Sequence, residues 1–258
     1  MLIPERQSRL EQLLSRRGMA DVETLAAELK VSQSTVRRDV EALEERGIVT
    51  RTHGGVIWVG QKERSDGARP YAFDQRMGYQ RQAKRSIARA AKSLVQPGET
   101  VLLDGGTTTF YLAQELLGRS LQIVTNSLPI ANLFLNDEQV ELVLIGGLVY
   151  PRYGVLLGPM AETMTSAIHA KTMFLSVAGA DGGVLYNQNL LLVQAERQMM
   201  QQAQQVVLLI DAGKFGQRAL AQLCNLDEID VVVSDPAMTD EHRRQVREAG
   251  CELVIADS

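Results

Sequence analysis

A cluster of hydrogen-bonding side chains between positions 33 and 38 has the clearest chemical potential near the amino terminus. Its members are Gln33, Ser34, Thr35, Arg37 and Arg38. An arginine guanidinium can donate two parallel hydrogen bonds to a guanine edge, and amides and hydroxyls bond to base edges or phosphates. These residue types therefore suit contact with the major groove of duplex DNA. The alternative is the solvated face of an ordinary amphipathic helix, which the cluster alone does not exclude.

A second polar cluster follows an apolar run in the carboxyl-terminal part of the chain. It comprises Asp104, Gly105, Gly106, Thr107, Thr108 and Thr109. Glycines let backbone amides approach a ligand, hydroxyls donate to its oxygens, and a helix N-terminus favours an anion. This composition is typical of a phosphate cradle, although it matches neither the dinucleotide fingerprint nor the Walker A sequence. A plain strand-to-helix turn needs only one glycine and one threonine, so the repeated residues favour the cradle.

Further polar residues recur where later apolar runs end, which is where open α/β sheets bind ligands. The candidates at these ends are Asn126, Gly147, Gly179, Asp181 and Lys214. We expect Lys214 to offer a point charge to a phosphate, and Glu196, on an expected helix over 190–203, to bind sugar hydroxyls. Taken singly, each residue has a simpler explanation as a turn glycine, a helix cap or a surface charge. The prediction is that they converge at one sheet edge.

The elements that position the first cluster form a helix-turn-helix pattern. Asp21 and Ser32 are expected N-caps of two short helices. The second helix carries its apolar stripe at Val36, Val40 and Leu43. At about 100° per residue, Arg37 and Arg38 point away from that stripe. A preceding helix from Pro4 to Gly18 and two β-type runs, 48–51 and 56–59, complete the order of a winged helix-turn-helix.

The turn between the two β-type runs is the predicted wing. It carries Arg51 and His53, which we expect within reach of DNA phosphates or the minor groove. Simple solubility of an exposed hairpin is the alternative explanation for both residues.

From Thr100 onward, apolar runs typical of strands alternate with helical stretches. The expected strands are 101–104, 121–125, 140–145, 173–178, 206–211, 229–234 and 252–255. The continuous apolar run 206–210 suits a strand buried on both faces of a parallel sheet. The predicted fold class is α/β, with an N-terminal winged helix-turn-helix domain followed by a Rossmann-like, mostly parallel-sheet domain.

Composition and charge bound the domain organisation. The expected domains are 1–59 for the winged helix-turn-helix (motif about 20–39), 60–72 for a polar linker, and 73–258 for an effector-binding α/β domain. The net charge is -4, so any DNA contact must come from a local basic patch. Cys224 and Cys251 argue for a reducing compartment, and we find no signal peptide or apolar run of membrane-spanning length. We expect a soluble, cytoplasmic protein.

The amino-terminal motifs resemble those of the DeoR family of bacterial transcriptional regulators. The similarity runs in register from about Pro4 to Trp58, through the run 31–39 (V-S-Q-S-T-V-R-R-D) and the wing 51–56 (R-T-H-G-G-V). This combination is more restrictive than a generic helix-turn-helix pattern. The resemblance implies that the first domain binds DNA.

The carboxyl-terminal motifs are similar to those of the DeoR-type sensor domain, which is itself similar to sugar-phosphate isomerases. They are D-G-G-T-T from Asp104, T-N-S from Thr125, Gly146-Gly147, Gly158-Pro159 and Lys214-Phe215-Gly216. The resemblance implies a phosphorylated sugar or related metabolite as effector, with residues 107–109 and Lys214 around its phosphate. One departure is clear, because Ala212 and Gly213 stand where the family usually carries two serines.

The favoured hypothesis is a transcriptional repressor of a carbohydrate-utilisation operon, with operator DNA and a sugar phosphate as partners. We expect a homo-oligomer, dimer or tetramer, because one winged helix buries little DNA. The alternatives are a sugar-phosphate isomerase fused to a DNA-binding domain, and an architectural DNA binder with a purely structural second domain. No catalytic residue, cofactor or metal is expected, since His53, His169 and His242 have no metal-ligand spacing.

Overall fold

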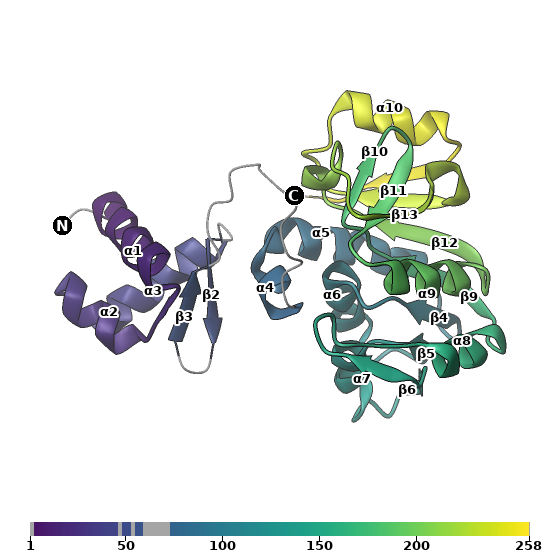
Figure 1. Ribbon diagram of the computed structural model, residues 1–258, viewed down its shortest axis with the longest axis horizontal. Coiled ribbons are helices and arrows are strands. Elements are labelled where there is room, and N and C mark those ends of the chain that lie inside the picture. Colours follow the sequence, from purple (N-terminus) through teal and green to yellow (C-terminus); the bar gives the residue numbers. More distant parts are fainter. Residues whose placement is uncertain (1–2, 46–47, 53–54, 59–72, 258) are drawn as a thin grey trace. The chain divides into compact units, whose positions relative to one another are not determined.

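The computed structural model describes residues 3–45, 48–52, 55–58 and 73–257 (Figure 1). Its contacts divide the chain into two compact units, Met1–Gln82 and Ala83–Ser258, and each is described by itself. The predicted linker over 60–72 lies outside the described residues. The contacts group α4 (Phe73–Gly78) with the first unit, although the sequence suggested that a second domain begins there. No helix in the described ranges is long and apolar enough to cross a membrane.

Helices α1 to α3 and a small antiparallel sheet form the first unit. The elements are α1 (Ile3–Arg17), β1 (Met19–Ala20), α2 (Val22–Leu29), α3 (Gln33–Glu45), β2 (Val49–Thr52) and β3 (Gly55–Trp58). The expected apolar stripes meet in one core that includes Leu14, Leu25, Val36, Val40 and Leu43. The winged helix-turn-helix order is therefore confirmed.

Side-chain caps begin both helices of the motif. The Asp21 carboxylate accepts a hydrogen bond from the Thr24 amide at 2.7 Å, and the Ser32 hydroxyl accepts one from the Thr35 amide at 3.2 Å. These bonds satisfy amides that have no partner within the helix. The two predicted N-caps are thus confirmed.

Strand β1 was not predicted, and it explains one glycine of the wing motif. It pairs with β3 so closely that a Cβ at Gly55 would lie 2.6 Å from the carbonyl oxygen of Ala20. Any larger residue at position 55 would push the two strands apart. Gly55 therefore allows the sheet to close with the order β1-β3-β2.

A seven-stranded, fully parallel sheet is the centre of the second unit. Its order is β15-β14-β12-β9-β4-β5-β6. The strands are β4 (Thr100–Leu103), β5 (Leu121–Thr125), β6 (Val140–Leu144), β9 (Ala170–Leu175), β12 (Ala203–Leu209), β14 (Val231–Ser234) and β15 (Glu252–Ile255). The chain adds strands on one side of β4 and then on the other, so the strand order reverses between β4 and β9. Ligands of open α/β sheets bind at such a reversal.

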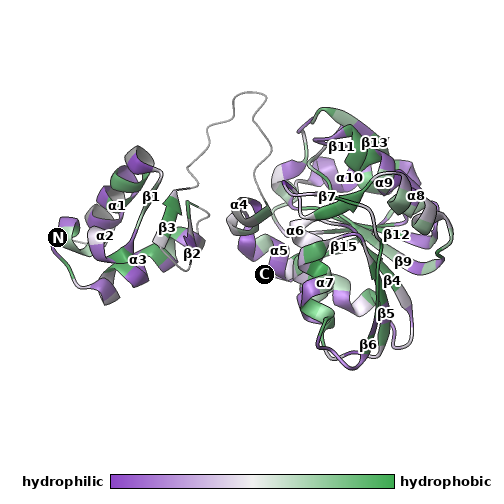
Figure 2. Ribbon diagram, turned by 60° about the horizontal axis from the view of Figure 1, so that its bottom comes forward, coloured by the Kyte–Doolittle hydropathy of each residue, from purple (hydrophilic) through white to green (hydrophobic). Residues whose placement is uncertain are grey.

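Helices cover both faces of this sheet. They are α5 (Arg81–Ala91), α6 (Thr107–Leu116), α7 (Leu128–Phe134), α8 (Pro159–Ser166), α9 (Leu190–Met200) and α10 (Asp240–Glu248), with short 3-10 turns η1 (Lys92–Leu94), η2 (Ala212–Lys214) and η3 (Leu226–Glu228). Figures 1 and 2 show α6 and α7 on one side of the sheet and α8 and α9 on the other. The predicted α/β class and parallel sheet are confirmed.

Most expected strands lie where they were predicted, and β9 shows why one differs. We expected it to span 173–178, but it ends at Leu175. The next residue, Ser176, turns its amide to the Asp104 carboxylate at 3.0 Å instead of to a neighbouring strand. A side chain across the sheet edge thus ends the strand, which the periodicity of one segment cannot reveal.

Two small antiparallel elements were missed. They are the hairpin β7 (Leu148–Tyr150) with β8 (Val155–Leu157), and the sheet of β10 (Gly179–Asp181), β11 (Val184–Asn187) and β13 (Ala221–Asn225). Strands of this length carry too few residues for an alternating pattern to be distinct from a loop.

Both cysteines are predicted to be unreactive in the folded protein. Cys224 and Cys251 are free and buried, and burial raises the pKa of the Cys224 thiol to about 12. Burial also raises the pKa of Cys251, so neither forms the reactive thiolate near pH 8. An Ellman titration at pH 8 should show almost no native reaction, and two thiols per chain once the protein is unfolded in guanidinium. Rapid native modification of either thiol would contradict the buried environment.

Candidate functional site

Helix α3 presents the predicted DNA-reading residues on its outer face. The side chains of Gln33, Ser34, Arg37 and Arg38 are exposed, and Thr35 is half-buried. The hydroxyls of Ser34 and Thr35 each lie 2.8 Å from the Ser32 hydroxyl. Their orientation is therefore fixed at the amino-terminal end of the helix, before any ligand arrives.

The arginines of this unit fall into two groups. Arg6 of α1 makes an ion pair with the buried Asp39 of α3, with a second bond from its Nη2 to Oδ1 at 3.0 Å. By contrast, Arg37 and Arg38 make no ion pair or hydrogen bond with any residue that the structure describes. Asp39 thus holds α3 against α1, while the two adjacent arginines remain available to a ligand.

The wing residue Arg51 is held from below by the end of α3. Its backbone amide and its Nε donate to the Glu44 carboxylate at 3.0 Å and 2.7 Å. Arg81 Nη1 approaches the same carboxylate at 3.5 Å. Glu44 therefore fixes the wing strand to α3, and the Arg51 guanidinium stays partly exposed. The other predicted wing residue, His53, lies outside the described residues.

In the second unit, the carboxylate of Asp104 organises the predicted cradle. It is buried at the end of β4 and accepts hydrogen bonds from the Gly106 amide at 2.8 Å and the Thr109 hydroxyl at 2.7 Å. The Ser176 amide, at the end of β9, donates to it at 3.0 Å. Burial raises the pKa of Asp104, against the opposite effect of these donors and of the Lys214 charge. Asp104 therefore joins the two strands at the reversal point.

Close packing accounts for both glycines of the cradle. A Cβ at Gly105 would lie 2.1 Å from Val155 Cγ1, and a Cβ at Gly106 would lie 1.8 Å from the Ser176 hydroxyl. The β7–β8 hairpin and the end of β9 thus reach directly to the loop. The glycines were predicted to admit a ligand, and here they admit the protein's own side chains.

The three threonines at the start of α6 differ in their bonding. Thr107, Thr108 and Thr109 are all buried, and Thr109 is engaged with Asp104. The Thr108 hydroxyl is buried without a hydrogen-bond partner, and no side chain caps the helix. A helix start with uncapped amides and an unpaired hydroxyl retains the capacity to bind an anion.

Lys214 lies near the cradle, together with an acidic residue that we did not select. Its ammonium donates to the Val177 carbonyl at 2.7 Å and lies 3.8 Å from Asp211 Oδ2. Both oxygens of the Asp211 carboxylate are buried without a hydrogen bond within the described part of the chain. Asp211 follows β12 much as Asp104 follows β4, but we counted it as the last residue of a strand. That shared position was the signal that could have identified it.

The remaining predicted effector residues do not all gather at this point. Asn126 donates to the Leu156 carbonyl at 3.2 Å, and its own Oδ1 is buried and unpaired. Glu196 accepts both its short bonds, at 2.8 Å, from the Asn187 amide. Asp181 pairs with the exposed Arg218 at 2.6 Å. Their roles in ligand binding stay predictions.

Two further predicted glycines are required by backbone packing. A Cβ at Gly147 would lie 2.7 Å from the Leu157 carbonyl oxygen, and a Cβ at Gly179 would lie 2.3 Å from that of Gln217. Both positions exclude a side chain whether or not a ligand binds.

Two family models together cover most of the chain. The DeoR-like helix-turn-helix domain matches residues 6–62, and the DeoR C terminal sensor domain matches residues 79–236. The chain belongs to the DeoR family. It is a DNA-binding transcriptional regulator and not an enzyme.

Named relatives match over nearly their full length. The HTH-type transcriptional regulator GlpR of Haloferax volcanii is 32% identical, with 98% of each chain covered. The HTH-type transcriptional regulator UlaR of Shigella dysenteriae serotype 1 is 29% identical, covering 97% of this chain and 98% of the relative. The chain therefore shares the two-domain organisation of these DeoR-family regulators.

Among solved structures, ribose 5-phosphate isomerase A from Methanocaldococcus jannaschii is similar to part of the chain. The TM-score is 0.39 at 17% identity, covering 52% of this chain and 54% of the isomerase. A likeness this weak says nothing about ligand or activity, so the assignment to the DeoR family depends on the sequence matches.

The two adjacent threonines should respond oppositely to removal of the hydroxyl. Thr109→Val takes a donor from a buried carboxylate, so we expect a loss of about 1.5–3 kcal/mol in the free energy of unfolding. Thr108→Val replaces an unpaired buried hydroxyl with a methyl group, so we expect no loss or a small gain. Urea unfolding followed by circular dichroism measures both. Equal losses in the two variants would contradict the bonding seen at Asp104.

Proposed function

We propose that this regulator represses a carbohydrate-utilisation operon, that α3 reads its operator, and that a phosphorylated sugar bound by the second unit controls it. Operator recognition and effector binding each depend on one unit, and each has its own supporting observation. The effector need only bind the DNA-competent and DNA-incompetent states with different affinity to switch the output.

The exposed, unpaired guanidiniums of Arg37 and Arg38 carry the proposal for DNA reading. A guanidinium held in an ion pair would have to break that pair before it contacted a base, and these two need not. Gln33 and the fixed Ser34 and Thr35 hydroxyls lie at the amino-terminal end of the same helix. The amino-terminal end of a recognition helix is the part that contacts base edges in this class of domain.

The charge of the whole chain supports a local contact. With a net charge of -4, the protein has no general attraction for nucleic acid. Affinity must then come from few phosphate contacts and from base contacts of two or more reading units on repeated half-sites. We propose a dimer or tetramer for this reason.

The end of β4 supports the proposal for a phosphorylated effector. The uncapped start of α6, the unpaired Thr108 hydroxyl and the Lys214 ammonium offer donors and positive charge to a phosphate. The unpaired carboxylate of Asp211 can accept hydrogen bonds only, which suits the hydroxyls of a sugar. Both halves of a sugar phosphate thus have complementary groups at the strand reversal.

Arg37→Ala should weaken operator binding. If the guanidinium contacts a base, the loss is about 1–3 kcal/mol, measured by gel-shift titration against the upstream region of the regulated operon. Arg247→Ala removes the same charge from an exposed position on α10 and is the matched control. Unchanged operator affinity in the Arg37 variant would remove this residue from the reading set.

A phosphorylated sugar should stabilise the protein against heat. A ligand at a hundred times its Kd adds roughly 2.7 kcal/mol, which a thermal-shift screen of pentose and hexose phosphates detects. Inorganic phosphate and the unphosphorylated sugars serve as controls for each half of the ligand. Lys214→Gln should reduce the shift, whereas Lys171→Gln, on the exposed start of β9, should leave it unchanged. No shift with any sugar phosphate would favour an architectural DNA binder.

A further inference from the structure

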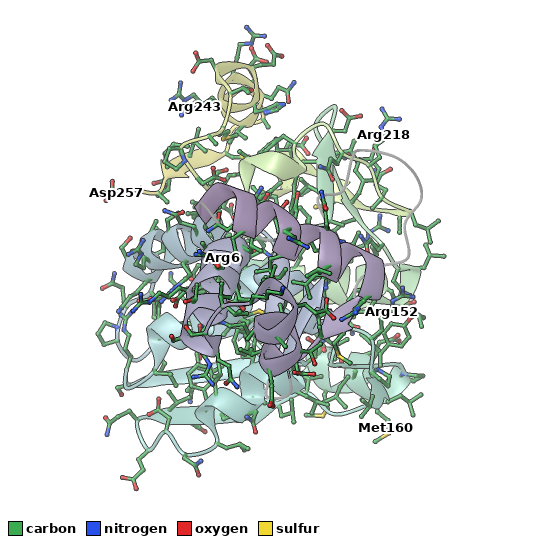
Figure 3. All side chains as sticks on the ribbon, turned by 90° about the vertical axis from the view of Figure 1, so that its left-hand side faces the viewer. Arg6, Arg152, Met160, Arg218, Arg243 and Asp257 are labelled. Carbon is green, nitrogen blue, oxygen red and sulfur yellow. The ribbon has the colours of Figure 1, made fainter. Side chains whose placement is uncertain are left out.

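The second unit exposes a group of large apolar side chains, which we call the β7 patch. Its members are Leu148 and Val149 of β7, Met160 of α8, and Leu190 and Leu191 of α9. Each is between 55% and 72% exposed. Figure 2 colours β7 as hydrophobic, and Figure 3 shows Met160 extending away from the ribbon. Scattered exposed leucines need no explanation, but a continuous apolar surface does.

Contacts at β7 show that these residues form one surface. Leu148 lies 3.7 Å from the Cβ position of Gly158, which is the N-cap of α8. At the other end of the strand, the Tyr150 hydroxyl accepts a bond at 3.1 Å from Asn189, the N-cap of α9. Met160 and the two leucines of α9 follow these caps directly. Strand β7 therefore bridges the first turns of both helices.

The segments that form the patch are almost free of charge. From 142 to 161 the only charged residue is Arg152, and from 182 to 195 there is none, in a chain of which 22% is charged. A surface of one charge sign would repel its own copy, whereas an uncharged apolar surface does not. Depletion of charge at the centre is also what distinguishes the core of a protein interface from the remaining surface.

The backbone of β7 adds a second reason. Within the described part of the chain β7 pairs only with β8, so its other edge offers unpaired amides and carbonyls. A two-stranded sheet is marginal on its own, and an open apolar edge is a template for another strand. Antiparallel pairing of β7 with the same strand of a second copy obeys two-fold symmetry, in which each copy contributes the same surface.

We propose that the β7 patch is the interface at which two copies of this chain associate. The two β7 strands pair across the two-fold axis, and the apolar side chains at the starts of α8 and α9 pack around them. The polar residues at the ends of the hairpin and along α8 form the rim. This proposal assigns a surface, and it depends on neither the operator nor the effector.

The oligomeric state of full-length variants tests the proposal without DNA or ligand. Leu148→Asp and Leu191→Asp each place two charges in the interface, because symmetry presents every substitution twice. We expect the dimer dissociation constant to rise on the order of a hundredfold in sedimentation equilibrium. Leu220→Asp and Leu135→Asp, at positions 78% and 66% exposed elsewhere on the second unit, should leave it unchanged.

A cross-link keeps the test valid if an aspartate variant fails to fold. Val149→Cys should form an intermolecular disulfide under mild oxidation, because the axis brings the two β7 strands together, and the native cysteines are buried. Leu220→Cys should remain monomeric on a non-reducing gel.

Three results would overturn the assignment. They are a wild-type protein that is monomeric at tens of micromolar, patch variants that associate as the wild type does, and a Val149→Cys variant that links no faster than Leu220→Cys. If the wild type is monomeric and sediments with phospholipid vesicles, the patch belongs to a lipid surface instead. A failed operator or effector experiment leaves these outcomes untouched, so the two proposals can fail separately.

Discussion

The buried carboxylate of Asp104 is the interaction on which the arrangement of the second unit's site depends. A carboxylate removed from water is costly unless donors surround it, and here donors come from its own loop, from α6 and from the end of β9. Meeting that requirement joins the two strands at which the sheet order reverses. It also uses the Thr109 hydroxyl internally and leaves the start of α6 without a cap. The same residue thus closes the structure around itself and leaves an anion-binding helix end unfilled.

The first unit follows the same logic with a different partner. Asp39 is buried and fixed by Arg6, so the acidic end of the family motif anchors α3 to α1 and does not read DNA. Glu44 then fixes the wing strand to the far end of the same helix through Arg51. Two anchored acidic residues determine where the helix lies, and two unanchored arginines between them and its start face outward. The positioning and the reading functions of one short motif are therefore carried by separate residues.

How much of this could be read from the sequence depended on whether the signal was local. The helix caps at Asp21 and Ser32, the apolar stripe of α3 and the long buried strands were predictable, because spacing within one segment determines them. The end of β9 was not, since it is set by a bond from Ser176 to a carboxylate far away in sequence. Asp211 was missed for a related reason: strand periodicity absorbed it, although its place after β12 matches that of Asp104 after β4. Glycines 105 and 106 were found, but the side chains that fill the space beside them belong to Val155 and Ser176.

The two kinds of contact proposed for this regulator differ in their physical basis, and salt separates them. Contact with operator phosphates releases counterions, so added salt weakens it steeply. Association through an uncharged apolar surface has no such dependence, and strongly hydrated anions such as sulfate strengthen it. Because a chain with a net charge of -4 has little general attraction for DNA, occupancy of an operator depends on two reading units held together. An apolar interface on the second unit maintains that pairing at salt concentrations where each reading unit alone would dissociate, and it does so without covering the arginines of α3.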